Sequence, residues 1–149
     1  MSDPEGRTFA DFAVGDEFET AARTVTEADI VNFAGVSGDF NDLHLDAEGM
    51  ADSAYGERIA QGALVFSMAT GLIWQADVTG DALVAFYGVD RLRFRAPVFV
   101  GDTLHVELTV AEKERREDAD DATGVVRLET EVVKDGEVAL SCELLSLLR

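Results

Sequence analysis

Positive charge is scarce in this sequence. Only 12 of its 149 residues are lysine or arginine, whereas 30 are aspartate or glutamate, so the formal net charge is −18. Nucleic acid is excluded as a partner because phosphate binding needs clustered positive charge, and anionic membrane surfaces are disfavoured for the same reason. A surface this acidic repels itself unless salt screens it. We therefore expect a protein adapted to the salt-rich cytoplasm of a halophile.

Cysteine, proline and long hydrophobic runs are also scarce. Cys142 has no second cysteine to pair with, and its apolar surroundings predict a buried thiol in a strand. Two prolines and 47% hydrophobic residues exclude a disordered acidic tail. No signal peptide pattern opens the sequence, and the longest apolar run, about residues 63–74, is too short to span a bilayer. These absences predict a soluble cytoplasmic protein.

Two of the three helices predicted in the first half of the sequence have clear patterns. Thr26 and Asp29 stand at the N-cap and third helical positions of a capping box, and an apolar stripe follows them. That helix should end within residues 35–38, where two glycines occur. Residues 62–74 are apolar nearly all round, and their number favours a buried helix over a strand.

Two shorter segments have weaker patterns. A short helix is predicted from Asp46 to Gly56, with Met50 and Ala54 directed inward. Residues 112–121 are almost all charged and are interpreted as a solvated loop between strands.

The second half of the sequence predicts antiparallel strands. Apolar and polar residues alternate in residues 91–95, 104–110 and 126–132. Asp135-Gly136 is a hairpin turn pattern that leads into a last strand over residues 138–148. A long buried helix followed by such strands predicts one α+β domain over residues 1–149, and the absence of crossover helices disfavours a doubly wound nucleotide-binding fold.

The two histidines differ in their surroundings. His105 lies in mid-strand opposite the apolar face and is interpreted as a solvated or interface residue. His44 lies in a polar segment with Asp39, Asn41 and Asp42, which is typical of general acid–base chemistry. Asp39 and His44 are five positions apart and can converge only if the segment turns. The alternative is that the polar residues only form a turn and that His44 is a satisfied, partly buried histidine.

A metal site at His44 is the weaker alternative. Asp42, His44 and Asp46 alternate and could share one face of an extended segment. The calcium-loop pattern fails because Leu43, His44 and Met50 occupy positions that need other residues. Zinc would need a further histidine or a cysteine pair nearby. We therefore expect neither a metal nor another cofactor.

Three segments together resemble one known family. Residues 37–46 resemble the S-x-D-x-N-P-x-H motif of the MaoC-like dehydratases, which include the (R)-specific enoyl-CoA hydratases. Residues 57–64 resemble the family's approach to its central helix, and residues 93–104 resemble its F-x-x-P-V-x-x-G-D-x-L motif. The resemblance implies a hot dog fold, in which an antiparallel sheet wraps a long central helix. It also implies a homodimer or higher oligomer that binds acyl-CoA thioesters.

The resemblance also implies roles for individual residues. Asp39 and His44 match the catalytic pair that binds and activates water. Gly62 matches the glycine whose backbone N–H donates to the thioester oxygen. Asn41 matches a residue that orients the loop or the water, and Thr70 matches a hydroxyl residue near the catalytic acid.

Several residues depart from the family pattern or add to it. Asp42 replaces the common proline of the motif, and Gln61 stands where many members have histidine. Arg91, Arg93 and Arg95 form the densest positive cluster and are a candidate patch for the coenzyme A phosphates. The alternative is an ordinary solvated strand face paired with nearby acids.

The expected activity is that of a hydro-lyase that reversibly hydrates a trans-2-enoyl-CoA to a 3-hydroxyacyl-CoA. A branched or dicarboxylic enoyl-CoA is a possible substrate of the same reaction. The alternatives are a hot dog acyl-CoA thioesterase and a non-catalytic acyl-CoA-binding subunit. Thioesterases generally lack the segment from Asp39 to His44, which favours the hydratase.

Overall fold

The computed structural model describes residues 7–117 and 122–149. Within these residues six strands form one antiparallel sheet, in the order β1-β4-β5-β6-β3 with β2 paired to β4. The elements in chain order are η1 (Phe9–Asp11), β1 (Glu17–Glu19), β2 (Arg23–Thr24), α1 (Glu27–Ser37), α2 (Asp42–Leu45), α3 (Ala47–Ala51), α4 (Gly62–Gln75), η2 (Gly80–Ala82), β3 (Leu83–Phe94), β4 (Thr103–Arg115), β5 (Gly124–Lys134) and β6 (Glu137–Leu148).

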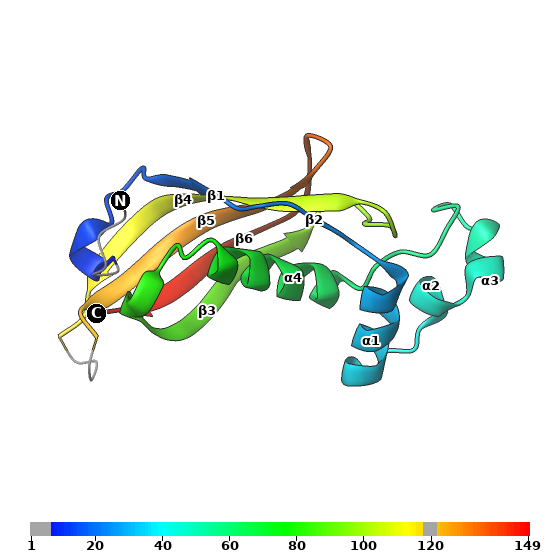
Figure 1. Cartoon of the computed structure of the whole chain (residues 1–149), viewed down its shortest axis with the longest axis horizontal. Helices are drawn as coiled ribbons and strands as arrows, with labels where there is room; N and C mark the ends of the chain where they lie inside the picture. Colours follow the sequence, from blue (N-terminus) through cyan, green and yellow to red (C-terminus); the bar gives the residue numbers. More distant parts are fainter. Residues whose placement is uncertain (1–6, 118–121) are drawn as a thin grey trace.

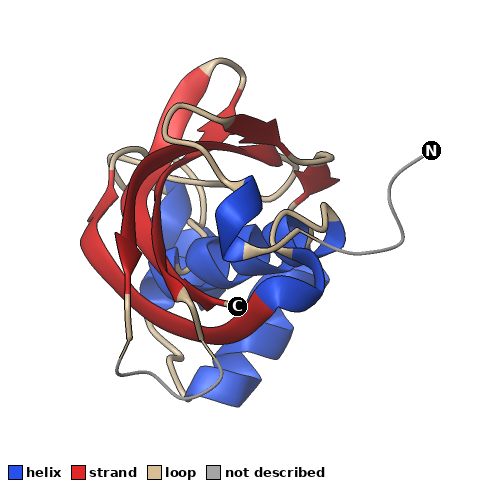
Figure 2. Ribbon diagram, turned by 90° about the vertical axis from the view of Figure 1, so that its left-hand side faces the viewer, coloured by secondary structure: helices blue, strands red, loops and turns tan. Residues whose placement is uncertain are grey.

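The curved sheet wraps around helix α4, and helices α1, α2 and α3 gather beyond one end of the sheet (Figures 1 and 2). The buried face of α4 packs against the apolar face of the strands, as the alternating pattern predicts. The core includes Leu64, Val65, Met68, Ala69 and Leu72 from α4, and Leu104, Val106, Leu108, Val110, Val126, Leu128, Val132, Leu140 and Leu144 from the strands. The predicted α+β arrangement of a long helix inside an antiparallel sheet is confirmed.

Helix α1 begins and ends as predicted. The Thr26 side chain accepts a hydrogen bond from the Asp29 N–H, and the Asp29 carboxylate accepts one from the Thr26 N–H. Partial burial acts to raise the pKa of Asp29, but hydrogen bonds from Thr26 and the charge of Arg23 outweigh it and lower the pKa below 3.8. Gly38 ends the helix in the left-handed conformation, with φ of 76°.

Helix α4 confirms the predicted buried helix of residues 62–74. It has 14 residues, and no helix within residues 7–117 or 122–149 is both long and apolar enough to cross a membrane. Residues 135–136 join β5 to β6, and the φ angles of Asp135 and Gly136, 47° and 73°, fit the predicted hairpin turn.

Several sequence-based expectations are wrong in detail. The short helix ends at Ala51 rather than Gly56, so Met50 is buried but Ala54 is exposed. Strand β4 continues to Arg115, because cross-strand pairing with β5 overrides the local run of charge, so residues 112–115 are not loop. Residues 118–121 of the predicted loop lie outside the described residues.

The alternation predicted for residues 91–95 is also incomplete. Arg91 has a φ of 53°, and the pairing of β3 with β6 shifts register between Asp90 and Arg93. Such a bulge changes which side of the sheet a side chain faces. Leu92 is therefore half-buried, whereas Phe94 is exposed on the surface of one chain.

Candidate active site

The turn after α1 fixes the position of the Asp39 carboxylate. The Asp39 N–H donates to Ser37 Oγ at 3.1 Å, and the Asn41 N–H donates to Asp39 Oδ1 at 3.2 Å. Asn41 then caps helix α2, because its Oδ1 accepts from the Leu43 N–H at 2.9 Å. The Asn41 side chain therefore orders the loop, while its role toward water or substrate stays a prediction. Asp39 Oδ2 stays directed toward the next helix.

Helix α2 carries His44 into a buried position facing Asp39. His44 Nδ1 lies 2.7 Å from the backbone oxygen of Ile59, and a carbonyl oxygen can only accept, so Nδ1 carries the hydrogen. In the neutral ring Nε2 therefore has a free lone pair. Nε2 lies 3.5 Å from Asp39 Oδ2. The turn thus brings the two predicted residues together, although they are five positions apart.

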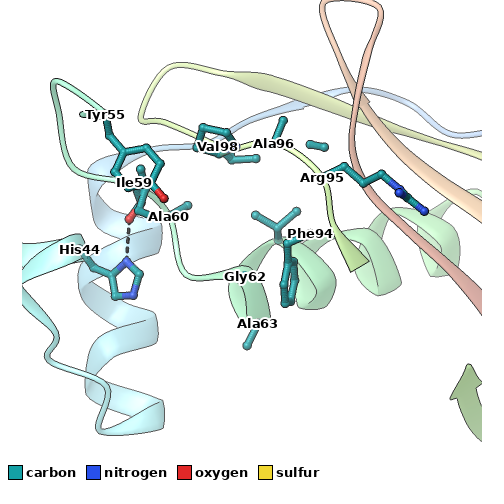
Figure 3. Close-up of a pocket in the computed structure, with 13 residues that line it drawn as sticks. His44, Tyr55, Ile59, Ala60, Gly62, Ala63, Phe94, Arg95, Ala96 and Val98 are labelled. Carbon is teal, nitrogen blue, oxygen red and sulfur yellow. Dashed lines mark hydrogen bonds between the residues drawn. The ribbon is translucent and has the colours of Figure 1, made fainter. Parts of the chain in front are cut away.

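A cavity of about 510 Å³ lies beside His44 (Figure 3). This volume is within the range of small-molecule sites in proteins. Its wall combines the first turn of α4, the C-terminal end of β3 and the segment before α4. It is lined by His44, Tyr55, Ile59, Ala60, Gly62, Ala63, Val65, Phe94, Arg95, Ala96, Pro97, Val98 and Ala139. Tyr55 and Phe94 were not predicted as site residues: no sequence pattern marks Tyr55, and Phe94 opens the F-x-x-P-V-x-x-G-D-x-L motif, which indicates the fold rather than the site. The lining is mostly apolar, with His44 as a polar group.

Gly62 joins this cavity at the first residue of α4. The N–H of a first helical residue has no partner within its own helix and lies at the positive end of the helix dipole. A Cβ at position 62 would lie 2.7 Å from two ring carbons of Phe94, and Figure 3 shows that ring beside Gly62. Glycine is therefore needed for the close approach of Phe94, and the position suits a donor to a bound oxygen.

Gln61 is a buried residue whose contact could not be predicted from the sequence. Its Nε2 donates to the backbone oxygen of Ile30 at 3.0 Å and so ties α4 to α1. Its Oε1 has no hydrogen-bond partner among the described residues. The link matters for the site because α1 leads into Asp39, whereas α4 begins with Gly62.

Thr70 does not line the His44 cavity. It lies eight residues beyond Gly62, about 12 Å along the helix, and its Oγ1 donates to the Ser67 backbone oxygen at 2.7 Å. It lines a second, mostly apolar cavity of about 390 Å³ with Trp74 and Phe86 among its neighbours. Within one chain the structure therefore does not bring Thr70 to Asp39.

The three arginines of the positive cluster have different surroundings. Arg91 pairs with Glu143 at 3.0 Å, and Arg93 donates to the Leu92 backbone oxygen. Arg95 donates to Ser141 Oγ and lines the His44 cavity. Of the three, only Arg95 lies at the candidate site.

The metal alternative at His44 gains no support. Asp46 caps helix α3 through its own Oδ1, which accepts from the Gly49 N–H. Within the part of the chain that the structure describes, the only group of three close metal-ligating side chains consists of Glu19, His105 and Glu107.

Cys142 is buried in β6, as predicted. Burial, together with the nearby charge of Glu143, raises the pKa of its thiol to about 11. The thiol is therefore protonated at neutral pH and unsuited to act as a nucleophile.

Comparison with known sequences gives a consistent set of relatives. A family model described as a MaoC-like domain matches residues 10–132. Protein MaoC of Klebsiella aerogenes is 44% identical over 110 residues, and the match covers 74% of this chain but 32% of that protein. The 3-hydroxybutyryl-CoA dehydratase of Methylorubrum extorquens is 38% identical, with 87% of this chain and 80% of that protein covered. The (R)-specific enoyl-CoA hydratase of Aeromonas caviae is 38% identical over 70% of this chain and 74% of its own length.

Solved structures resemble the whole chain. A structure described as a monoamine oxidase regulatory protein from Archaeoglobus fulgidus superposes with a TM-score of 0.88 and 36% identity, covering 97% of this chain and 95% of that one. A Mycobacterium tuberculosis protein described as a double hotdog fold superposes with a TM-score of 0.82 at 22% identity, covering 96% of this chain and 44% of that one. The predicted hot dog fold is therefore confirmed.

Proposed function

The chain belongs to the MaoC-like dehydratase family, and from this premise we propose that it reversibly hydrates a trans-2-enoyl-CoA to a 3-hydroxyacyl-CoA. The observation that carries the proposal is the pair formed by His44 and Asp39. His44 Nε2, left without a hydrogen in the neutral ring, lies 3.5 Å from Asp39 Oδ2. The 3-hydroxybutyryl-CoA dehydratase and the enoyl-CoA hydratase among the relatives support the same reaction class.

The pair handles protons on both sides of the reaction. As the oxygen of water bonds to the β-carbon of the enoyl thioester, water loses a proton to the pair. The α-carbon gains a proton from the pair, so that H and OH add across the double bond and no charge is left over. The hydrogen bond from Nδ1 to Ile59 keeps the ring oriented with Nε2 toward the reacting atoms.

Gly62 stabilises the intermediate charge. Negative charge develops on the thioester oxygen while the β-carbon is attacked, and a backbone N–H at a helix start is a suitable donor to that oxygen. Gly62 shares a cavity wall with His44, which supports an acyl group bound between them. The apolar lining suits the acyl chain.

Arg95 is our candidate contact for the coenzyme A phosphates. It is the member of the arginine cluster that lines the His44 cavity, and a guanidinium is a good phosphate donor. Replacing Arg91, Arg93 and Arg95 together should raise the KM for acyl-CoA. An unchanged KM would remove the phosphate patch from the proposal.

A second copy of the chain is proposed to cover strand β3. This strand is an edge of the sheet, and Phe86 on it is 50% exposed, while Trp74 on α4 is 67% exposed. Unpaired strand edges and exposed aromatic residues favour association, and Thr70 lines the cavity between these two residues. Sedimentation in molar KCl should show a dimer or a larger oligomer, and Phe86→Glu should weaken it.

An absorbance assay with crotonyl-CoA in molar KCl tests the reaction. Loss of the enoyl absorbance without free thiol supports the hydratase. Release of thiol would assign the chain to the acyl-CoA thioesterases instead. Neither signal across short, long, branched and dicarboxylic enoyl-CoA substrates would favour a non-catalytic acyl-CoA-binding subunit.

From the charge of −18 we propose that stability and substrate binding depend on salt. We also propose that the protein works in a salt-rich cytoplasm. Salt screens the repulsion between acidic groups and between this surface and an anionic substrate. The unfolding temperature should therefore rise, and the KM for acyl-CoA should fall, from dilute buffer to molar KCl. Unchanged stability would contradict the adaptation to salt.

A further inference from the structure

A row of glutamates crosses three neighbouring strands on the solvent face of the sheet. Glu19 of β1 is directly opposite Glu107 of β4, and Glu107 is directly opposite Glu131 of β5. Like charges at directly opposed positions destabilise a strand pair. Among the ion pairs of residues 7–117 and 122–149, none joins these three glutamates to a lysine or an arginine. The row therefore favours a cation from solution.

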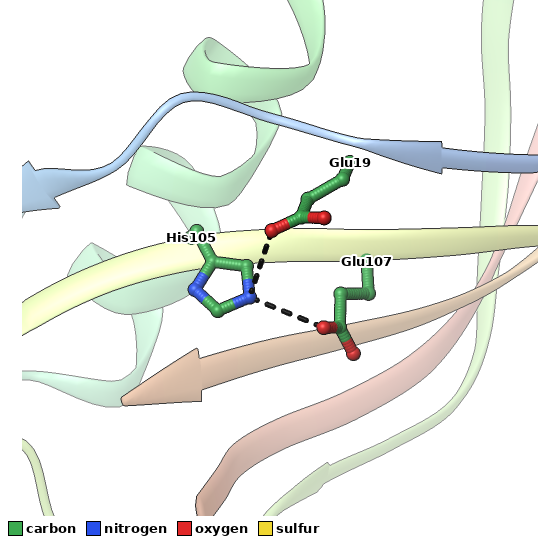
Figure 4. Close-up of side chains that lie close together, drawn as sticks. All are labelled: Glu19, His105 and Glu107. Carbon is green, nitrogen blue, oxygen red and sulfur yellow. Dashed lines mark hydrogen bonds and ion pairs between the residues drawn. The ribbon is translucent and has the colours of Figure 1, made fainter. Parts of the chain in front are cut away.

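His105 adds a nitrogen ligand to this row. It stands two residues before Glu107 on the same strand and so faces the same side of the sheet. Its Nε2 lies 3.2 Å from Glu107 Oε1, within hydrogen-bond distance, and 3.6 Å from Glu19 Oε1, and both carboxylates point at this nitrogen (Figure 4). All three ligand atoms lie within 4.8 Å of one another.

These separations suit a tetrahedral ion. Bonds of about 2.0–2.2 Å to nitrogen and oxygen place neighbouring ligand atoms about 3.3–3.6 Å apart around tetrahedral Zn²⁺, close to both distances from His105 Nε2. Mg²⁺ and Ca²⁺ prefer oxygen ligands alone, so the imidazole favours a transition ion. His105 is half-buried, with 26% of its side chain exposed, whereas the glutamates are reachable from solvent.

We propose that Glu19, His105 and Glu107 bind one divalent transition-metal ion of the Zn²⁺ type, with water completing the coordination. Coordination of one ion by both Glu19 and Glu107 would offset the repulsion between their carboxylates. It would join β1, a strand of three residues, to the long strand β4. The site lies on the outer face of the sheet and is separate from the His44 cavity, so its role is structural and does not depend on the proposed reaction.

Calorimetric titration with ZnCl₂ in molar KCl tests the site, because salt screens diffuse attraction to an acidic surface much more than direct coordination. We expect one ion per chain and a rise in unfolding temperature on binding. His105→Gln should weaken binding at least about tenfold, the smallest loss typical of changes around metal sites. Co²⁺ in place of Zn²⁺ should give visible absorption bands that His105→Gln removes.

Two further variants distinguish direct coordination of the ion from nonspecific attraction to an acidic surface. Glu19→Gln should weaken Zn²⁺ binding, whereas Glu129→Gln, on the neighbouring β5, should leave it unchanged. Circular dichroism establishes that each variant is folded. Equal Zn²⁺ affinity in the parent and in both His105→Gln and Glu19→Gln would overturn the site. Saturable binding of Mg²⁺ at the same concentrations would also overturn it, because it would indicate counter-ions on an acidic face.

Discussion

Both histidines of the chain lie close to carboxylates, but they differ in burial and in what their ring nitrogens contact. His44 is buried, faces one carboxylate and lines a cavity, and its second ring nitrogen is held by a backbone oxygen. His105 is half-buried on the outer face of the curved sheet, with two carboxylates directed at a single nitrogen. A fixed ring with one free nitrogen at a cavity wall suits proton transfer. A nitrogen that shares its surroundings with two carboxylates suits an ion.

The difference shows that residue types alone do not assign a role. Both regions contain histidine and acids, and both could be described as an acid–base cluster from composition. What separates them is the group bound to the other ring nitrogen and the presence of a cavity. Each of the following experiments tests one part of that contrast.

Replacing the side chains of the His44 pair, with the His105 cluster as the control, gives the largest expected effect on activity. Asp39→Asn and His44→Ala should each lower kcat by about 100-fold or more, the usual size of a general acid–base contribution. His105→Gln and Glu107→Gln should leave kcat and KM close to the parent values. The measurement is the initial rate of crotonyl-CoA hydration in molar KCl.

The double variant of Asp39 and His44 sharpens this result. Residues that act as a unit are strongly non-additive, so the combined loss should be close to that of the worse single variant. Full activity in both single variants would remove the pair from the site. A loss in His105→Gln equal to that in His44→Ala would end the contrast between the two regions.

A matched pair of glycines in α4 tests how closely the His44 region is packed. Gly62→Ala places a Cβ 2.7 Å from the Phe94 ring. Because this ring is exposed and can turn aside, we expect a cost of about 1 kcal/mol, the lower end of overpacking costs. Gly71→Ala meets no atom within 4 Å and should stabilise the helix by about 0.5–1 kcal/mol. Urea unfolding measures both. Equal effects at the two positions would mean that Phe94 is free to move away from Gly62.

The stability of helix α1, which leads into the Asp39 turn, should depend on pH. Asp29 caps the helix that leads to Asp39, and its pKa in the folded state is lowered. A lowered carboxyl pKa stabilises the fold above the unfolded-state value and loses that contribution as pH falls through the folded-state value. The stability advantage of the parent over Asp29→Asn, measured as the difference in free energy of unfolding, should therefore shrink from neutral pH to about pH 3. Parallel curves for the two proteins would contradict this role.

The smallest expected effect is at Cys142, on the sheet. Its raised pKa of about 11 leaves almost no thiolate at neutral pH, so disulfide reagents should react slowly with the folded protein. Unfolding in urea should expose the thiol and restore a normal rate. Rapid reaction in the native state would show that this part of the sheet opens readily.

The regular parts of the fold could be predicted because their signals are local. The capping box of Thr26 and Asp29, the turn at Asp135-Gly136 and the alternation of the strands each depend on neighbouring residues. The candidate pair could be named but not placed, because the contact of Asp39 with His44 depends on the Asn41 cap and the unexpected short helix α2.

Features that depend on distant parts of the chain could not be predicted. Strands β1 and β2 are too short for a periodic pattern and exist because β4 offers them an edge. The link from Gln61 to Ile30 joins residues 31 positions apart. The row of Glu19, Glu107 and Glu131 likewise follows from strand register, which the local sequence does not specify.

The bond from His44 to Ile59 has a consequence for how substrate preference can change. Ile59 lies on the segment that leads directly into Gly62, so the imidazole and the proposed oxyanion donor are attached to the same short stretch of backbone. Residues 51–58 connect α3 to Ile59 and include Tyr55 at the cavity wall, but they are not needed for the link between His44 and Ile59. Insertions or substitutions there can reshape the entrance while the spacing of the reacting groups is kept. If the proposed reaction holds, selection can therefore change which acyl group enters at residues 51–58 without moving His44 relative to Gly62.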